Sequence, residues 1–166
     1  LLKSIFISGS ISEFSKDWDE NKVVRFTHEL AKKLVQHNYR IVSGFGLGLG
    51  SSIINGALEE IMESKYKHID EHLCLRPFPQ IQTGSISLEE QRGIYRVDMI
   101  AQSGIAIFLF GNKRVDDKTV IADGMLKEFE NAKDQNKIII PVGSTGSAAK
   151  EIFDEINRIY NLNFDL

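Results

Sequence analysis

Short apolar runs alternate with segments whose apolar residues recur at helical spacing, and this alternation constrains the fold more than any other feature. The apolar runs are Ser4–Ser8, Arg40–Ser43, His72–Leu75, Ile105–Phe110 and Lys137–Val142. The helical segments are Val23–His37, Ile53–Met62, Glu89–Ala101, Met125–Ala132 and Ala148–Tyr160. Repeated strand–helix–strand units form parallel sheets whose crossover helices cover both faces. The sequence therefore predicts an α/β fold: a Rossmann-like, doubly wound parallel sheet of about five or more strands with helices on both faces.

Length and composition favour one domain over residues 1–166. The chain is 42% hydrophobic, enough for a single full core, and shows no internal repeat or linker. It opens with Leu1-Leu2-Lys3 rather than Met, so we expect a fragment of a longer protein whose amino-terminal domain is absent.

Charge and patterning exclude several function classes. A net charge of −3 argues against a duplex nucleic-acid partner, which usually requires a basic face. No apolar run reaches the length of a membrane span and no signal peptide is present, so we expect no membrane partner and a cytoplasmic location. The single cysteine, Cys74, lies in an apolar run and is expected to be a buried strand thiol.

A glycine-rich turn separates the second apolar run from the helical segment after it. Glycines occupy every second position of Ser43–Ser52, namely Gly44, Gly46, Gly48 and Gly50. Few Cβ atoms and the start of a helix at Ser51 would let a phosphate approach free amide groups. The dinucleotide fingerprint is incomplete, because Ser51 holds the position of its third glycine. We predict a phosphate cradle for a nucleotide; the alternative is a turn that only lets helix and sheet pack closely.

Ligands of doubly wound sheets bind beyond the carboxyl ends of the strands. Besides the glycine turn, four segments fall there: Ser8–Ser10, Arg76–Pro79, Gly111–Arg114 and Gly143–Ser147. We expect all of them to converge on one rim. The hydroxyls of Ser8-Gly9-Ser10 suit a ribose hydroxyl or a phosphate oxygen.

Charged residues on the later helices could complete this site. Arg92 and Arg96 lie one turn apart, and an arginine pair suits a pyrophosphate, although a solvated surface charge is the simpler explanation. Glu128 follows Gly124 at the start of another helix. There its carboxylate could accept hydrogen bonds from a ribose diol, assist cleavage at a glycosidic carbon, or only be stabilised by the helix dipole. Trp18 is a weaker candidate for stacking on a base, and it could equally anchor its loop. The four histidines show no spacing typical of a metal site.

The whole chain resembles the SLOG superfamily, which is related to the Lonely Guy phosphoribohydrolases. The resemblance is carried by Ser8-Gly9-Ser10, the glycine turn, Arg96–Met99 with Ser103–Leu109, and Gly124 followed by Glu128. It implies that Arg96 and Glu128 match the pair that splits a base from ribose 5′-phosphate. The enzymes' double-glycine turn is replaced here by Gly111-Asn112-Lys113 and an insertion, Arg114–Ile121. This departure favours a larger ligand with two phosphates.

Within that superfamily the chain is most similar to carboxy-terminal SLOG domains of NAD-cleaving effectors in Thoeris anti-phage defence. Phe6–Ser10, the glycine turn and Gly93–Val97 carry this similarity. It implies a regulatory sensor, without catalytic residues, metal or cofactor of its own, that binds a cyclic ADP-ribose isomer, the 3′-linked form being expected. Binding would activate an amino-terminal sirtuin-like domain whose substrate is NAD+. The expected assembly is a homo-oligomer, with a dimer of this domain and a tetramer of the parent.

The resemblance and the residue patterns together define the expected binding site. Its residues are Ser8, Gly9, Ser10, Gly44, Phe45, Gly46, Gly48, Phe78, Arg92, Arg96, Gly111, Lys113, Gly124 and Glu128. Two alternatives stay open. One is a phosphoribohydrolase of nucleoside monophosphates that uses Arg96 and Glu128, and the other is an interaction domain without a nucleotide ligand.

Overall fold

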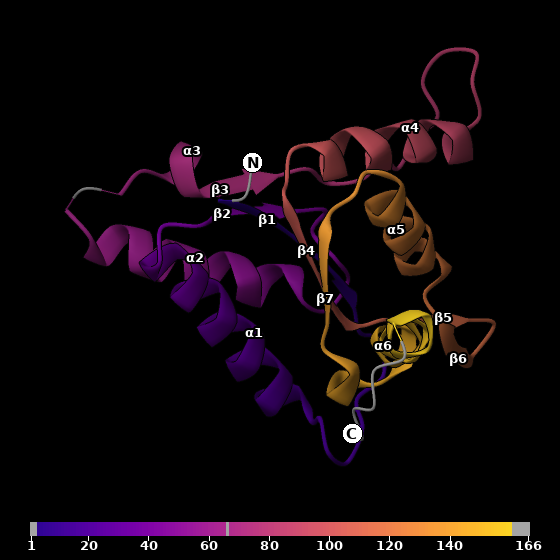
Figure 1. The fold of residues 1–166 in the computed structure, drawn as a ribbon, viewed down its shortest axis with the longest axis horizontal. Helices are drawn as coiled ribbons and strands as arrows, with labels where there is room; N and C mark the ends of the chain where they lie inside the picture. Colours follow the sequence, from indigo (N-terminus) through magenta and orange to yellow (C-terminus); the bar gives the residue numbers. More distant parts are fainter. Residues whose placement is uncertain (1–2, 66, 161–166) are drawn as a thin grey trace.

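A five-stranded parallel sheet forms the centre of the molecule, in the order β3-β2-β1-β4-β7 (Figure 1). The computed structural model describes residues 3–65 and 67–160. The strands are β1 (Ser4–Ser10), β2 (Arg40–Ser43), β3 (Leu73–Leu75), β4 (Ile105–Phe110) and β7 (Ile138–Pro141). All neighbours pair in parallel. The predicted α/β class and the five predicted strands are confirmed. Because the chain builds β2 and β3 on one side of β1 and then β4 and β7 on the other, the strand order reverses between β1 and β4, where such sheets bind ligands.

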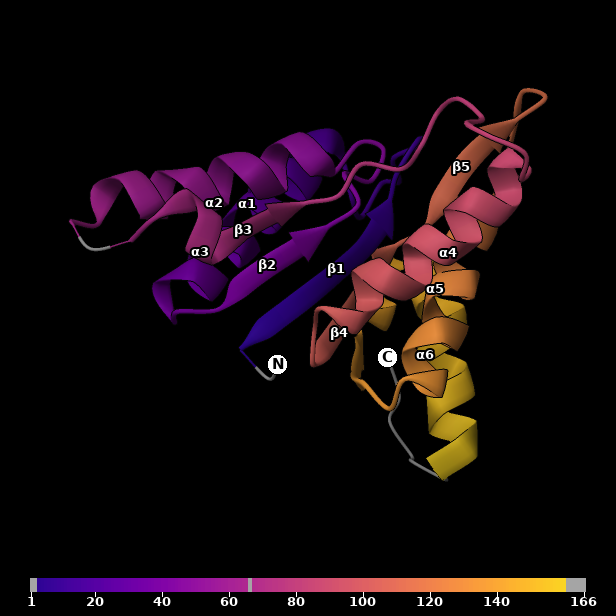
Figure 2. The same cartoon turned by 90° about the horizontal axis from the view of Figure 1, so that it is seen from above.

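Helices cover both faces of this sheet, as predicted (Figures 1 and 2). On one face lie α1 (Glu20–Gln36) and α2 (Gly50–Glu63), and on the other lie α4 (Leu88–Ala101), α5 (Asp123–Asp134) and α6 (Ser147–Tyr160). The helix expected from Val23 begins earlier, because the side chain of Asp19 caps it by accepting a hydrogen bond from the Lys22 amide at 2.9 Å. Within the described residues, no helix has the length and apolar character needed to cross a membrane.

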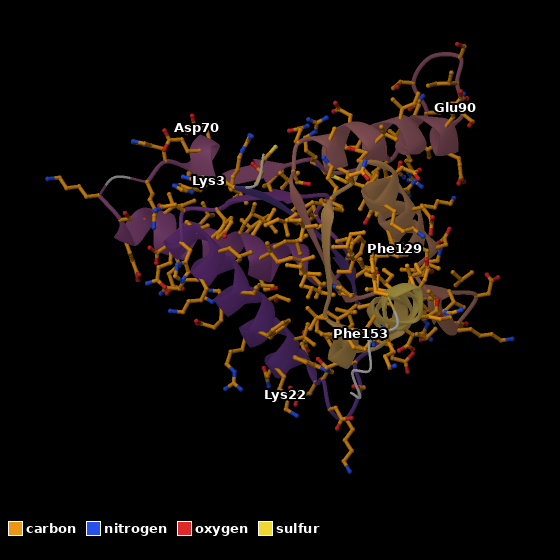
Figure 3. The ribbon with its side chains drawn as sticks, in the orientation of Figure 1. Lys3, Lys22, Asp70, Glu90, Phe129 and Phe153 are labelled. Atoms are coloured by element: carbon orange, nitrogen blue, oxygen red, sulfur yellow. The ribbon has the colours of Figure 1, made fainter. Side chains whose placement is uncertain are left out.

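Side chains of β1 alternate between two hydrophobic cores. Ile5 and Ile7 face α1 and α2, whereas Phe6 packs with residues of α4, α5 and α6. The second core includes Phe129 of α5, which lies in the interior, while Lys22, Asp70 and Glu90 project outward (Figure 3). Ser8 follows Phe6 by two residues and therefore faces α5, and this register places its hydroxyl in the candidate site.

Three features of the fold are absent from the sequence prediction. One is a single helical turn, α3 (Ile69–His72), and another is the 3-10 turn η1 (Gly143–Thr145). The third is an antiparallel hairpin of β5 (Asn112–Val115) and β6 (Lys118–Ile121), which occupies the predicted insertion.

The base of the hairpin is fastened to the rest of the molecule. The amide of Ala122 donates to the carbonyl of Gly111 at 2.8 Å, so the hairpin leaves and rejoins the fold at one place. The Asn112 side chain accepts hydrogen bonds from the amides of Ser12 at 2.8 Å and Glu13 at 3.0 Å. The hairpin base and the loop after β1 therefore hold each other beside the end of β1.

Candidate ligand-binding cleft

Two connected cavities lie over the carboxyl end of β1. We call the first, of about 530 Å³, the glycine lobe; its lining is Phe6, Ile7, Ser8, Gly9, Gly44, Phe45, Gly46, Leu47, Gly48, Gly50, Ser51, Pro77, Phe78, Gln80 and Glu128. The second, of about 420 Å³, is the charged lobe; its lining is Gly9, Ser10, Gly46, Leu47, Phe78, Gln80, Glu89, Arg92, Arg96, Lys113, Ala122, Asp123, Gly124, Met125, Lys127 and Glu128. The lobes share Gly9, Gly46, Leu47, Phe78, Gln80 and Glu128, so they form one cleft. Each lobe has the size of a small-molecule site.

The backbone of the glycine turn packs tightly on the end of β1. A Cβ atom on Gly46 would lie 1.9 Å from the carbonyl oxygen of Gly9, and one on Gly48 would lie 2.2 Å from that of Ile11. Gly48 also has a φ of 75°, in the left-handed region that favours glycine. The protein's own packing thus requires these two glycines, which agrees with the alternative of a packing turn.

The same turn nevertheless offers hydrogen-bond donors to the cleft. In the part of the chain that the structure describes, the amides of Gly46, Leu47 and Gly48 donate to no other group. Helix α2 begins immediately after them, and its N-cap residue, Leu49, supplies no side-chain hydrogen bond. Free amides together with an uncapped helix N-terminus can bind an anion. The geometry therefore allows the predicted phosphate cradle as well as the packing role.

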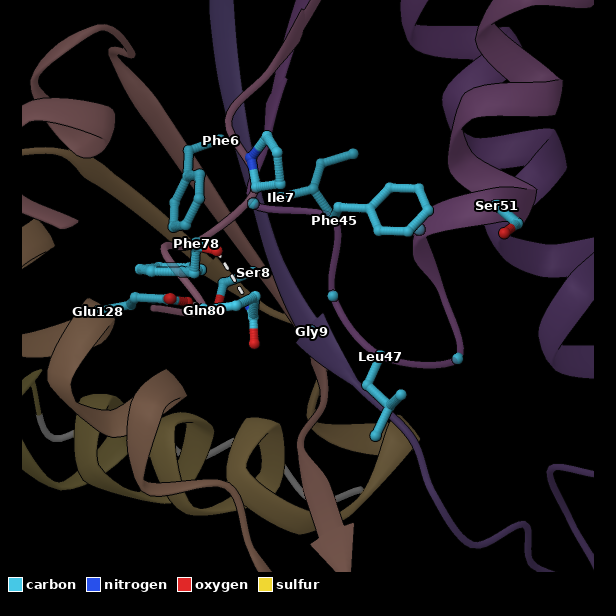
Figure 4. Close-up of a pocket in the computed structure, with 15 residues that line it drawn as sticks. Phe6, Ile7, Ser8, Gly9, Phe45, Leu47, Ser51, Phe78, Gln80 and Glu128 are labelled. Atoms are coloured by element: carbon cyan, nitrogen blue, oxygen red, sulfur yellow. Dashed lines mark hydrogen bonds between the residues drawn. The ribbon is translucent and has the colours of Figure 1, made fainter. Parts of the chain in front are cut away.

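Aromatic rings face the glycine lobe from two directions. Phe45 is 48% exposed and has a φ of 58°, an uncommon conformation for a bulky residue. Figure 4 shows Phe78 with Ser8 and Glu128 on one side of this lobe, and Phe45 and Ser51 on the other. Both rings line the lobe, and aromatic rings offer flat apolar surface on which a base can stack.

A stack of rings and guanidinium groups holds Phe78 between the lobes. The guanidinium carbon of Arg96 lies 5.0 Å from the centre of the Phe78 ring, which lies 5.7 Å from that of Tyr95. Arg76 lies 5.0 Å from the centre of the Tyr95 ring and donates from Nε to the tyrosine hydroxyl at 3.2 Å. These contacts fix the ring of Phe78 against Arg96.

Ser8, Arg96 and Glu128 meet at the junction of the lobes. The Ser8 hydroxyl donates to Oε2 of Glu128 at 2.5 Å, and Nε of Arg96 lies 3.8 Å from Oε1. Glu128 is only 7% exposed, and burial raises the pKa of its carboxyl to about 7, against the opposing effects of the Ser8 hydrogen bond and the Arg96 charge. Nε of Arg96 is itself buried and, among the described residues, has no hydrogen-bond partner. The junction thus combines a carboxyl that titrates near neutral pH with an unsatisfied cationic donor.

Ion pairs line the outer part of the charged lobe. Lys113 of the hairpin pairs with Asp123, and Lys127 of α5 pairs with Glu89 of α4. The hydrogen bonds from these lysines hold the pKa values of both carboxyls below their usual range. Nε of Arg92 donates to the carbonyl of Pro79 at 3.0 Å.

All of the sequence-predicted site residues except Gly111 line one lobe or both. Gly111 has a φ of 108°, and a Cβ atom there would lie 2.4 Å from the Cβ of Ala148. It therefore serves packing beneath α6. A Cβ atom on Gly124 would lie 3.4 Å from Nη2 of Arg96, so that glycine leaves room for the guanidinium.

Of the fifth predicted segment, Gly143–Ser147, residues 144–147 line a separate cavity of about 220 Å³ rather than the cleft. Trp18 lies there: its Nε1 donates to the carbonyl of Ser144 at 2.9 Å, and its ring packs edge-on against Phe110 with centres 5.2 Å apart. The expectation that all five segments share one rim is wrong for this segment. Trp18 anchors its loop, the second of the two roles considered for it.

Sequence reasoning missed four polar lining residues: Gln80, Glu89, Asp123 and Lys127. Glu89 and Asp123 lie in the first turns of helices that follow strand-end loops. The rule that ligands bind at carboxyl strand ends could have included them, because those helix starts border the same rim.

The sequence model of STALD, the Sir2- and TIR-associating SLOG family, matches residues 1–165. Three similar curated proteins are each named NAD(+) hydrolase ThsA. The protein of Bacillus cereus (strain MSX-D12) is 43% identical over 156 residues, covering 94% of this chain and 32% of the relative. That of Enterococcus faecium is 40% identical over 165 residues, covering 99% and 33%, and that of Cytobacillus dafuensis is 42% identical over 158 residues, covering 95% and 32%. The chain spans about a third of the length of these relatives.

Proposed function

Since the chain belongs to the Sir2- and TIR-associating SLOG family, we propose that it is the nucleotide-sensing domain of a Thoeris defence effector. The relatives that it matches are named as NAD(+) hydrolases. In this proposal the hydrolysis of NAD+ belongs to another part of the protein, and this domain controls it.

The proposed ligand is a cyclic ADP-ribose isomer, with the 3′-linked form as the first candidate. Such a molecule carries a pyrophosphate, two riboses and an adenine. The charged lobe offers Arg96 and Lys113 to the phosphates, and the glycine lobe offers Phe45 and Phe78 to the base. Glu128 and the free amides of the glycine turn would bind ribose hydroxyls and the remaining phosphate oxygens.

The place of Arg96 in the charged lobe is the single observation that carries this assignment. Its Nε atom is enclosed by the protein, so the terminal nitrogens of the guanidinium would be the donors to an anionic ligand. Phe78 and Glu128 hold the guanidinium in place from two sides. The site is therefore arranged in advance for a negatively charged group.

Regulation requires that the ligand bind two states of the protein with different affinities. We propose that these states are two arrangements of a homo-oligomer, a dimer of this domain within a tetramer of the parent protein. Binding would stabilise the arrangement in which the NAD+ hydrolase domain is active.

A second function, hydrolysis of nucleoside monophosphates to base and ribose 5′-phosphate, is favoured by one observation. Arg96 and Glu128 lie side by side, and a carboxyl whose pKa is about 7 suits general acid–base catalysis. Against it, the hairpin occupies the place where such enzymes carry a tight glycine turn for a monophosphate.

Calorimetric titration with cyclic ADP-ribose isomers, linear ADP-ribose, NAD+ and adenosine monophosphate tests both functions. We expect one cyclic isomer to bind most tightly and to be recovered intact. Release of adenine from the monophosphate, without binding of any cyclic isomer, would replace the sensor with the hydrolase.

A further inference from the structure

Charges of alternating sign run along the charged lobe from its rim to its interior. In order they are Lys113, Asp123, Lys127, Glu89, Arg96 and Glu128. Lys113, Asp123, Lys127 and Glu89 are between 39% and 76% exposed, whereas the side chains of Arg96 and Glu128 are 13% and 10% exposed. The interior of the lobe therefore holds Arg96 beside Glu128, and on its rim carboxylates stand beside lysines. Arg92 also lines the lobe, and its Nε donates to the carbonyl of Pro79.

Helix capping does not explain Glu89, whereas Asp123 also accepts a hydrogen bond from the Gly124 amide in the first turn of α5. Ser87 already caps α4 by accepting a hydrogen bond from the Glu90 amide at 3.2 Å. Glu89 instead reaches across to Lys127 on α5, and Asp123 reaches to Lys113 on the hairpin. Both carboxylates thus stand in the cleft, where an entering ligand would meet them.

A linear chain of phosphates would meet these charges one after another. Two phosphates bound by Arg96 and one rim lysine would take up the inner part of the lobe. A third would lie on the rim, beside Glu89 or Asp123, whose lysine partners are already paired. Like charges placed together in an interface are strongly unfavourable and are a common means of rejecting the wrong partner. A shorter pyrophosphate escapes this repulsion.

We propose that Glu89 and Asp123 are specificity-determining residues that admit a diphosphate group to the cleft and reject a triphosphate. The inference deepens the proposed function, since it concerns the ligand of the same cleft. It explains how a sensor could ignore abundant nucleoside triphosphates while it responds to a pyrophosphate-containing signal.

The test measures the affinity of the purified chain for inorganic pyrophosphate and tripolyphosphate, and for ADP and ATP, by calorimetry in buffer free of divalent cations. The variants are Glu89→Gln, Asp123→Asn and the double substitution. Asp154→Asn is the matched control, because Asp154 also pairs with a lysine, Lys150, but lies outside both lobes. Thermal unfolding shows which variants fold. Glu89→Gln and Asp123→Asn lie on different helices and are tested separately. If Asp123→Asn does not fold, Asp123→Ser replaces it.

We expect the unsubstituted chain to prefer pyrophosphate over tripolyphosphate by about tenfold or more, and ADP over ATP likewise. The double variant should lose this preference by gaining affinity for the triphosphates, whereas Asp154→Asn should keep it. The inference is overturned if the unsubstituted chain binds both polyphosphates equally or binds neither. It is also overturned if the double variant keeps the preference, or gains affinity equally for both polyphosphates.

The outcome for the proposed function is separate. If no cyclic ADP-ribose isomer binds but the preference for pyrophosphate exists and disappears in the double variant, the sensor assignment fails and this inference stands. If a cyclic isomer binds and the variants leave the preference unchanged, the sensor assignment stands and this inference fails.

Discussion

Backbone atoms shape the glycine lobe of the cleft, whereas side-chain ends shape the charged lobe. The glycine lobe is shaped by backbone, with Gly46 against the carbonyl of Gly9 and Gly48 against that of Ile11. The charged lobe is shaped by the ends of long side chains, such as Lys113 and Lys127, that come from the hairpin and from α5. One lobe is part of the packing of the sheet, and the other is added to its surface.

Because of this difference, we expect substitutions in the two lobes to affect the stability of the fold and the affinity for the ligand differently. Substitutions in the glycine lobe should disturb the fold and the ligand together, because the same atoms serve both. Substitutions of the exposed side chains of the charged lobe, such as Lys113 and Lys127, should change the affinity for the ligand and leave the free energy of unfolding almost unaltered. The predictions below test that division.

Arg96→Ala should give the largest change, a loss of about 2–5 kcal/mol in ligand affinity, the range for truncating one partner of a buried charge pair. The buried guanidinium is the innermost cation of the charged lobe, and its removal also leaves Glu128 without a counter-charge. Calorimetry with the tightest cyclic isomer measures the loss. Arg114→Ala, which removes the same charge from the exposed hairpin, is the control; equal effects of the two substitutions would contradict the site.

Gly46→Ala should lower the free energy of unfolding by about 3 kcal/mol, the upper part of the range for overpacking. The added methyl would lie 1.9 Å from a backbone oxygen that cannot move independently. Thermal unfolding should show a midpoint lower by roughly 6–12 °C for a chain of this size.

Gly93→Ala provides the contrast to that substitution. A Cβ atom on Gly93, inside α4, meets no atom within 4 Å, so alanine should stabilise the helix by about 0.5–1 kcal/mol. If both alanines were tolerated alike, the glycine lobe would not be part of the packing.

Glu128→Gln should change the pH dependence of stability by up to about 3 kcal/mol. The folded-state pKa of about 7 lies above the ordinary value of 4.5, so the folded chain retains a proton that the unfolded chain has released. Stability from this group is therefore full below pH 4.5 and is lost as the pH rises through 7.

Chemical denaturation at several pH values measures this effect as the difference between the variant and the unsubstituted chain. The glutamine variant should gain relative stability as the pH rises from 4.5 to about 7, the window set by the two pKa values. Glu151→Gln, an exposed substitution on α6, should leave the pH profile unchanged. A parallel profile for Glu128→Gln would show that the carboxyl is not buried as described.

Lys113→Ala should give the smallest change, a loss of about 0.5–1 kcal/mol in ligand affinity. The lysine is 39% exposed and already pairs with Asp123, so solvent and its partner both weaken its attraction for a phosphate. High salt should abolish the difference. Lys118→Ala on the neighbouring strand of the hairpin controls for net charge; a loss for Lys113→Ala as large as that for Arg96→Ala would erase the distinction between rim and interior.

Apolar patterning was sufficient to predict the sheet and its main helices, because a short unbroken apolar run such as Ile105–Phe110 differs from a longer segment with an apolar residue every three or four positions. The hairpin escaped prediction because Asp116-Asp117, with φ values of 46° and 62°, makes its turn without the usual glycine. The positions of Arg96 and Glu128 within the cleft followed from family resemblance rather than from spacing, which left a surface charge equally plausible.

The partners of each charged side chain could not be predicted, because they depend on tertiary contacts between distant segments. Lys113 pairs with Asp123 because the end of the hairpin returns to Gly111, where Ala122 is hydrogen-bonded, just before α5 begins. Trp18 is a similar case, since its anchor at Ser144 lies at the other end of the chain.

The hydrogen bond from Ala122 to Gly111 makes the hairpin a closed, ten-residue excursion from the sheet. A segment attached in this way can change in length or sequence without moving any strand. Since Lys113 of the hairpin lines the charged lobe, such a change would alter the rim of the cleft and leave both hydrophobic cores in place.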